Sequence, residues 1–209
     1  MQRSQRHRRL RELGAKSSAI QRYEQVLTHL APFDELVRSK ILNAGPPTAL
    51  TRYLLELQVP VTSTSDQDLR GRLTYADKQF DFVICTEVLE RLHDCEDSPR
   101  DTWTFSGMIA CLSELRRVGK RLLLSTPNVC SWRAVKRLLN GRHPYEYVPH
   151  VRELAPRDVR NLLTQTGWKE DRIWTEDCWG GVSSPLAKRM AALCNRTSMR
   201  GDVIYAKAN

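Results

Sequence analysis

Two short apolar segments place the strongest constraint on how this chain can fold. Residues 80–85 and 122–125 are each mostly apolar, and each is followed by small polar residues. The stretch between them is long enough for one helix, which is the connection that parallel strands require. Near-continuous apolar runs of this length indicate strands that are buried on both faces. The pattern therefore predicts an α/β domain whose ligand site lies beyond the carboxyl ends of its strands.

The rest of the chain alternates between helical and extended patterns. We predict helices over 1–38 (interrupted at Pro32), 48–57, 103–118, 132–139 and 155–166. We predict strands over 40–44, 59–64, 80–85, 122–125, 172–175 and 203–206, with a further short strand near 73–75. Gly119 is expected to end the third of these helices at the C′ position. Such alternation is typical of an α/β protein with a mainly parallel sheet.

The length of 209 residues suits one main domain, which we place at residues 39–209, after an N-terminal helical extension over residues 1–38. Basic residues crowd the start of this extension and contribute to a net charge of +9. A basic segment of this kind either contacts phosphates or forms a solvated helix face. No RNA-binding signature accompanies it, so we do not expect a nucleic-acid partner.

Composition narrows the class of protein further. No apolar run approaches the roughly 18 residues that a membrane-spanning helix needs, and no apolar segment near the start resembles a secretory signal. The six cysteines form no C-x-x-C pair, and the five histidines are scattered. We therefore expect free thiols, a reducing cytoplasmic compartment and no metal site. The sequence does not predict the oligomeric state.

Several segments, in a fixed order, carry a family resemblance. They are residues 41–45, 73–83, 87–92, 125–128, 150–154 and 200–206. Together they resemble the class I S-adenosylmethionine-dependent methyltransferases over roughly residues 35–207. The resemblance implies a doubly wound, mainly parallel, seven-stranded Rossmann-like sheet with helices on both faces. It also implies S-adenosylmethionine as cofactor, bound over the carboxyl ends of the strands.

The resemblance places part of the cofactor against the turn after the first strand. Asn43, Ala44 and Gly45 are the residues expected to contact it there. The family usually has an acidic residue where Asn43 stands, and two or three glycines in the turn. Here Pro46 and Pro47 follow instead, and neither can donate a backbone N–H. The alternative is a tight Gly-Pro turn that binds no ligand.

Two further strand ends complete the expected cofactor site. Ser65 stands where the family has a carboxylate that accepts the ribose hydroxyls, and Asp66, one residue later, could take that role. Thr86, Glu87 and Val88 follow the strand over 80–85 and are expected to contact the methionine or adenosine part. The alternatives are that Asp66 is a solvated turn residue and that Glu87 favours the start of a helix.

Substrate contacts are expected after the strand that ends near residue 125. The residues are Asn128, Tyr145, Tyr147 and Arg152. His150 is the candidate catalytic residue, because histidine ordinarily titrates near neutrality and could accept a proton from the acceptor. The alternative is that His150 and Glu153 fix a loop by hydrogen bonds. Glu90 and Arg91 are expected to form a surface pair.

These observations favour methyl transfer to an unidentified small-molecule or biosynthetic acceptor. The methyl group would pass to an oxygen, nitrogen or carbon nucleophile by in-line displacement. A non-catalytic relative that acts as a binding or scaffold subunit is the alternative, and Asn43, Ser65 and the two prolines favour it. A third hypothesis is a nucleic-acid-binding protein that uses its basic segment, for which salt-dependent binding is the signature.

Overall fold

The computed structural model describes residues 3–96, 105–144, 150–176 and 199–209. Its helices are α1 (Arg3–Glu12), α2 (Ser17–His29), α3 (Phe33–Leu36), α4 (Ala49–Glu56), α5 (Ser106–Val118), α6 (Trp132–Leu139) and α7 (Pro156–Gln165), with a short 3₁₀ helix, η1 (Leu89–Arg91). Its strands are β1 (Ile41–Asn43), β2 (Val61–Ser63), β3 (Phe80–Thr86), β4 (Gly119–Pro127), β5 (Glu170–Glu176) and β6 (Val203–Ala208). Within these ranges, no helix is both long and apolar enough to cross a bilayer.

The described strands form one mixed, six-stranded sheet in the order β2-β1-β3-β4-β6-β5. Strand β1 runs parallel to both β2 and β3, and β3 runs parallel to β4. Strand β6 lies antiparallel between β4 and β5, so β5 shares the direction of β4. The prediction of a mainly parallel α/β sheet is confirmed. The seven strands that the family resemblance implied are not seen, because the described residues supply six.

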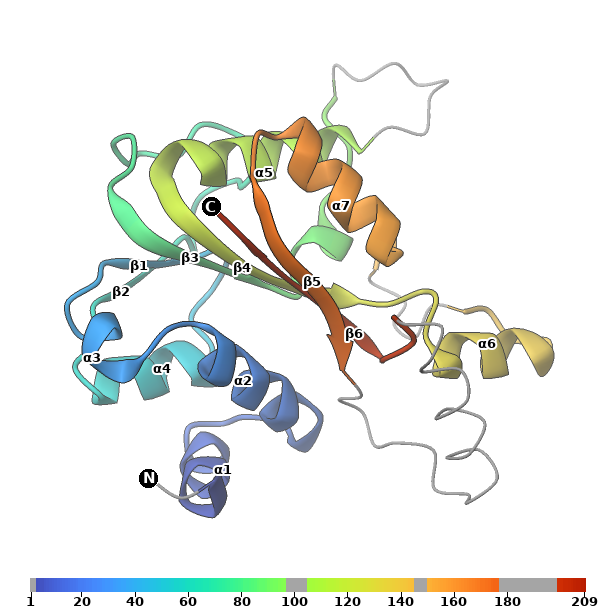
Figure 1. The fold of residues 1–209 in the computed structure, drawn as a ribbon, viewed down its shortest axis with the longest axis horizontal. Helices are drawn as coiled ribbons and strands as arrows, with labels where there is room; N and C mark the ends of the chain where they lie inside the picture. Colours follow the sequence, from blue (N-terminus) through green and yellow to red (C-terminus); the bar gives the residue numbers. More distant parts are fainter. Residues whose placement is uncertain (1–2, 97–104, 145–149, 177–198) are drawn as a thin grey trace.

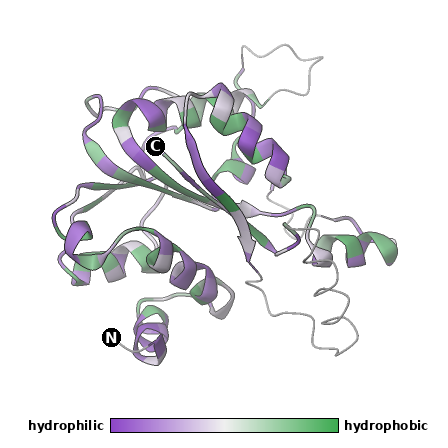
Figure 2. Ribbon diagram, in the orientation of Figure 1, coloured by the Kyte–Doolittle hydropathy of each residue, from purple (hydrophilic) through white to green (hydrophobic). Residues whose placement is uncertain are grey.

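Helices cover both faces of the sheet (Figure 1). One face packs against α5 and α7, and the other packs against α2, α3 and α4. Strand β3 alternates between them: Val83 and Cys85 belong to the first cluster, whereas Phe82 and Ile84 belong to the second. Figure 2 shows the matching concentration of apolar residues along the strands. This double burial explains why the segment reads as a continuous apolar run instead of an alternating one.

The N-terminal helices contribute to this core. Val26 and Leu30 of α2 and Leu36 of α3 are buried in the same cluster as Ile41 and Ile84 of the sheet. Helix α1 packs beside them, in a smaller cluster around Leu10. Helices α2 and α3 of the extension therefore pack against the sheet and belong to its core.

The prediction of a short strand near residues 73–75 is wrong. The backbone there pairs with side chains of α5 instead of a neighbouring strand. The N–H of Leu73 donates to Glu114 Oε1 (2.7 Å), and Arg117 donates to the carbonyls of Leu73 (3.0 Å) and Tyr75 (2.8 Å). Because these side chains satisfy the backbone groups, the segment needs no strand partner.

Gly119 directly follows the last residue of α5, as predicted, but the expected C′ conformation is wrong. It is not a left-handed C′ residue, since its φ is −118° and it is the first residue of β4. The reason for a glycine is space: a Cβ atom here would lie 2.2 Å from Val83 Cγ2 and 3.1 Å from the carbonyl oxygen of Leu115. The absent side chain lets α5, β3 and β4 meet closely.

The substitution Gly119→Ala should therefore destabilise the fold by about 1–3 kcal/mol, the usual cost of overpacking a close contact. The measurement is the free energy of unfolding in urea. Gly71→Ala is the matched control, because a Cβ there meets its nearest atom at 3.5 Å. We expect that control to stay within about 0.5 kcal/mol of the wild type. Equal effects of the two substitutions would contradict the close-contact explanation.

Candidate functional site

The turn that begins with Asn43 follows β1, and hydrogen bonds connect it to the carboxyl end of β2. Gly45 has a φ of +102°, which favours glycine, and its N–H donates to Thr64 Oγ1 (2.7 Å). The buried Asn43 amide donates to the carbonyls of Gly45 and Pro46 (3.1 Å each) and lies 3.3 Å from Ser63 Oγ. The residue that replaces the family's acid therefore holds the shape of the turn.

The carboxyl end of β3 meets the same turn. The N–H of Ala44 donates to a carbonyl of β3 (2.8 Å), and the N–H of Glu87 donates to the carbonyl of Ser125 on β4 (2.9 Å). Val88 lies close by, with its Cγ2 3.6 Å from the position that a Cβ of Gly45 would occupy. Two of the predicted cofactor-binding segments, residues 43–45 and 86–88, therefore lie side by side.

The remaining predicted cofactor residues lie at the edges of this convergence. Thr86 is the last residue of β3 and pairs with Ser125 of β4. Ser65 and Asp66 are exposed in a turn that begins two residues after β2. Beyond the turn, Thr48, the first residue of the helix predicted over 48–57, caps α4 through a reciprocal pair of bonds with Thr51.

Sequence reasoning missed Arg22, which comes from α2. Its Nη1 donates to Glu87 Oε2 (2.9 Å), across 65 residues of sequence. Burial raises the pKa of Glu87, and the positive charge of Arg22 opposes that rise. The other carboxylate oxygen of Glu87 is buried and has no hydrogen-bond partner among the described residues. No local sequence signal could have joined these two residues.

Glu90 is fully buried, so the prediction of a surface pair with Arg91 is wrong for it. Thr126 Oγ1 donates to Glu90 Oε2 (3.0 Å). Burial, with the nearby charge of Glu87 as the next cause, raises the pKa of Glu90 to about 8. The sequence held no local signal for this burial, because Glu87 has a left-handed backbone before η1 and the two carboxyl groups do not belong to one helical turn.

His150 lies against Glu90. Its Nδ1 is 2.8 Å from Glu153 Oε1, and its Nε2 is 4.0 Å from Glu90 Oε1. The imidazole is only 5% exposed. A carboxylate beside Nδ1 favours a proton on that nitrogen of the ring. The His150–Glu153 pair that was predicted as an alternative does form, and the same pair leaves Nε2 directed at a buried carboxyl group.

Asn128 is buried just after the end of β4, and both the nitrogen and the oxygen of its side-chain amide form hydrogen bonds. Its Nδ2 donates to the carbonyls of Met199 (3.0 Å) and Gly201 (2.7 Å), and its Oδ1 accepts from the N–H of Cys130 (3.0 Å). The side chain thereby joins the chain segments before β6 and after β4.

Arg152 and the two tyrosines complete the predicted substrate residues. The Arg152 guanidinium lies over the Phe105 ring, 4.5 Å from its centroid. Tyr145 and Tyr147 lie outside the described residues.

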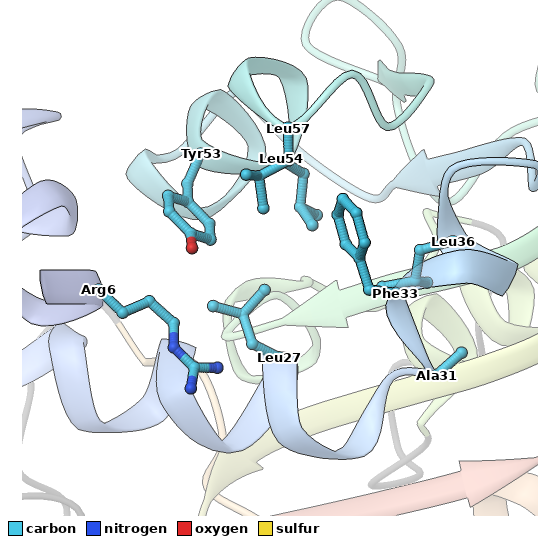
Figure 3. A pocket seen from close by; sticks show the side chains of 8 residues that line it. All are labelled: Arg6, Leu27, Ala31, Phe33, Leu36, Tyr53, Leu54 and Leu57. Atoms are coloured by element: carbon cyan, nitrogen blue, oxygen red, sulfur yellow. The ribbon is translucent and has the colours of Figure 1, made fainter. Parts of the chain in front are cut away.

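Two cavities open on the helical face that carries α1 to α4. The first, of about 320 Å³, lies beside the Gly45 turn and is lined by Leu13, Gly14, Ala15, Lys16, Ser18, Ala19, Arg22, Tyr23, Pro47, Thr48, Ala49 and Arg52. The second, of about 410 Å³, is lined by apolar side chains of α2, α3 and α4 together with Arg6, Tyr53 and Leu57 (Figure 3). Neither cavity is lined by a predicted site residue. In the described part of the chain, no three His, Cys, Asp or Glu side chains are grouped to hold a metal ion.

Solved structures resemble this arrangement across most of the chain. An S-adenosylmethionine-dependent methyltransferase from Archaeoglobus fulgidus superposes with a TM-score of 0.61 at 11% identity, covering 94% of this chain and 96% of that chain. The chain has the class I methyltransferase fold. An S-adenosylmethionine-dependent methyltransferase from Mesorhizobium loti gives a TM-score of 0.53 at 12% identity, covering 93% and 98%.

A third structure with the methyltransferase fold is the small RNA methyltransferase HEN1. It matches with a TM-score of 0.54 at 12% identity, over 89% of this chain and 25% of that chain. No protein-family model matches the sequence, and no curated protein matches it. The likeness therefore lies in the fold, which is preserved at low sequence identity.

The buried Glu90 should make stability depend on pH. Its pKa in the folded protein, about 8, exceeds the ordinary value of 4.5, so the folded state holds an extra proton between these values. Stability is therefore greatest below the ordinary pKa and falls as the pH rises toward 8. Relative to Glu90→Gln, the wild type should lose about 2–5 kcal/mol between pH 5 and pH 9.

Urea unfolding at several pH values measures this difference. Glu12→Gln is the control, because the pKa of the exposed Glu12 is lowered by Arg9 and Arg8 and its carboxylate stays ionised over this range. The control should show no pH-dependent difference from the wild type. A Glu90→Gln variant that parallels the wild type at every pH would refute the buried-carboxyl explanation.

Proposed function

We propose that this protein transfers the methyl group of S-adenosylmethionine to an unidentified small-molecule or biosynthetic acceptor. The observation that carries the proposal is the convergence of three strand ends on one turn, where the N–H of Gly45 is bonded to Thr64 and Val88 lies beside the missing Cβ of Gly45. Ligands of open α/β sheets bind at such carboxyl ends. The methyltransferase fold of the chain agrees with this activity.

The cofactor would lie against the residues that were predicted from the sequence. Asn43, Ala44 and Gly45 would face one part of it, and Thr86, Glu87 and Val88 would face another. Two observations fit a bound ligand: the left-handed Gly45 keeps the turn free of a side chain, and the buried Glu87 Oε1 has no partner among the described residues. The exposed Ser65–Asp66 turn is free to accept ribose hydroxyls from the solvent side.

The protein's share of the chemistry is positioning and proton handling. S-adenosylmethionine supplies a methyl group that its sulfonium already activates, so alignment with the acceptor provides much of the rate. His150 would accept the acceptor's proton, with its ring orientated by Glu153 at Nδ1; because Nε2 faces the buried Glu90, this role requires the acceptor to reach the ring beside Glu90. Asn128, Tyr145, Tyr147 and Arg152 remain the proposed substrate residues.

The acceptor is the least determined part of the proposal. A small molecule is our hypothesis, because the chain shows no RNA-binding signature. An RNA acceptor is the other hypothesis, since one structure of the same fold is a small RNA methyltransferase and this chain carries a net charge of +9. We further propose a cytoplasmic protein with residues 1–38 as an extension and residues 39–209 as the methyltransferase-like domain.

A scaffold role is the second candidate function. Pro46 and Pro47 offer no N–H, and the N–H of Gly45 is already bonded to Thr64. The turn therefore provides few backbone donors for a cofactor. A protein that kept the fold and lost the cofactor would tolerate this loss.

Calorimetry separates the two functions. We expect the wild-type protein to bind S-adenosylhomocysteine, the demethylated product. Asp66→Ala should weaken this binding about tenfold or more, because it removes a charged acceptor for two hydroxyl groups. The melting temperature should not change, since Asp66 is exposed.

Asp34→Ala is the matched control, because Asp34 is exposed in α3, before the amino end of β1. It should bind S-adenosylhomocysteine as the wild type does. Absence of binding by the wild type at millimolar ligand would favour the scaffold function. If the Asp66→Ala and Asp34→Ala variants bind S-adenosylhomocysteine equally well, Asp66 does not contact the cofactor.

A further inference from the structure

The cavity beside the Gly45 turn has an unusual charge. It lies between the start of α2, the segment that precedes it, and Pro47, Thr48 and Ala49 at the start of α4. Lys16, Arg22 and Arg52 contribute three cationic side chains to its wall, and none of its lining residues is Asp or Glu. A cavity lined in this way favours an anionic group.

Only part of this positive charge is offset within the described residues. Arg22 is paired with Glu87 at the edge of the cavity. Lys16 and Arg52 form no ion pair in the described ranges, and Arg52 donates instead to the carbonyl of Leu13 (3.3 Å). That bond holds the Arg52 guanidinium near Gly14, whose Cβ position is 3.9 Å from Nη1. One of the cations is thus held in place before any ligand arrives.

The position of the cavity connects it to the candidate site. Pro47 lines it directly, and Pro46 and Pro47 cannot donate N–H groups to a ligand at this turn. Lys16 and Arg22 of the N-terminal extension and Arg52 of α4 line the same cavity as Pro47. Charge-assisted hydrogen bonds from such groups are stronger than bonds from neutral amides.

We propose that this cavity binds a carboxylate or phosphate group of the ligand held at the carboxyl ends of β1 and β3. Lys16 and Arg52 are the binding residues, and Arg22 links the cavity to Glu87. The anionic group belongs either to the amino-acid end of the cofactor or to the acceptor. Both sources rest on the proposed function, whereas the anion site itself does not.

The test compares Lys16→Ala/Arg52→Ala with Arg157→Ala/Lys169→Ala. Both double variants lose two positive charges, and Arg157 and Lys169 are exposed residues away from the cavity. The probe is inorganic phosphate, titrated by calorimetry or by ³¹P line broadening. We expect the first variant to bind phosphate about ten- to a hundredfold more weakly, and the second to match the wild type. Lys16→Ala alone leaves the Arg52 bond to Leu13 intact, so weaker phosphate binding by this variant would not result from a folding defect caused by the loss of that bond.

S-adenosylhomocysteine and 5′-methylthioadenosine, which lacks the amino-acid end, identify the source of the anion. Weaker binding of the first ligand alone by the Lys16/Arg52 variant assigns the cavity to the cofactor's carboxylate. Unchanged binding of both ligands, with phosphate binding lost, assigns it to the acceptor. Phosphate binding without any nucleoside binding by the wild type would sustain the anion site and refute the proposed function. No phosphate binding, or equal phosphate affinity in all the proteins, overturns the anion site.

Discussion

The burial of β3 on both faces is the constraint on which the rest of this structure depends. Phe82 and Ile84 face α2 to α4, and Val83 and Cys85 face α5 and α7. From Phe82 to Cys85, every side chain of the strand is buried and apolar. Polar groups therefore gather past its carboxyl end, where neighbouring parallel strands end at the same edge. The location of the candidate site follows from this packing before any ligand is considered.

Burial also governs the chemistry at that edge. Glu87 lies between β3 and η1, Glu90 lies in η1, His150 comes from a later loop, and Arg22 comes from α2. Charges removed from water are costly unless a partner or a proton offsets them. Arg22 offsets the charge of Glu87 through an ion pair. Glu90 avoids the cost of a buried charge by holding a proton, since its pKa is raised. The N-terminal extension thus helps to determine which carboxyl groups at the site are ionised.

Local patterns in the sequence predicted most of the elements. The apolar runs identified the strands, the spacing of apolar residues identified the helices, and Thr48 marked the start of α4. The errors arose where a distant side chain decides the outcome. Arg117 satisfies the backbone at Leu73 that was predicted as a strand, and Val83 explains Gly119. Glu90 resembled a surface residue because its burial depends on segments remote in sequence.

The backbone at Glu87 has a consequence for how this site can change. Its φ of +57° is left-handed, a conformation that costs a residue with a side chain about 1–2 kcal/mol. Glycine would relieve that cost, but it would also discard the carboxylate that meets Arg22. At this position the backbone conformation favours glycine, whereas the ion pair with Arg22 favours glutamate. A descendant that no longer needed the charge would drift toward glycine here, so the identity of this single residue records whether the negative group is still in use.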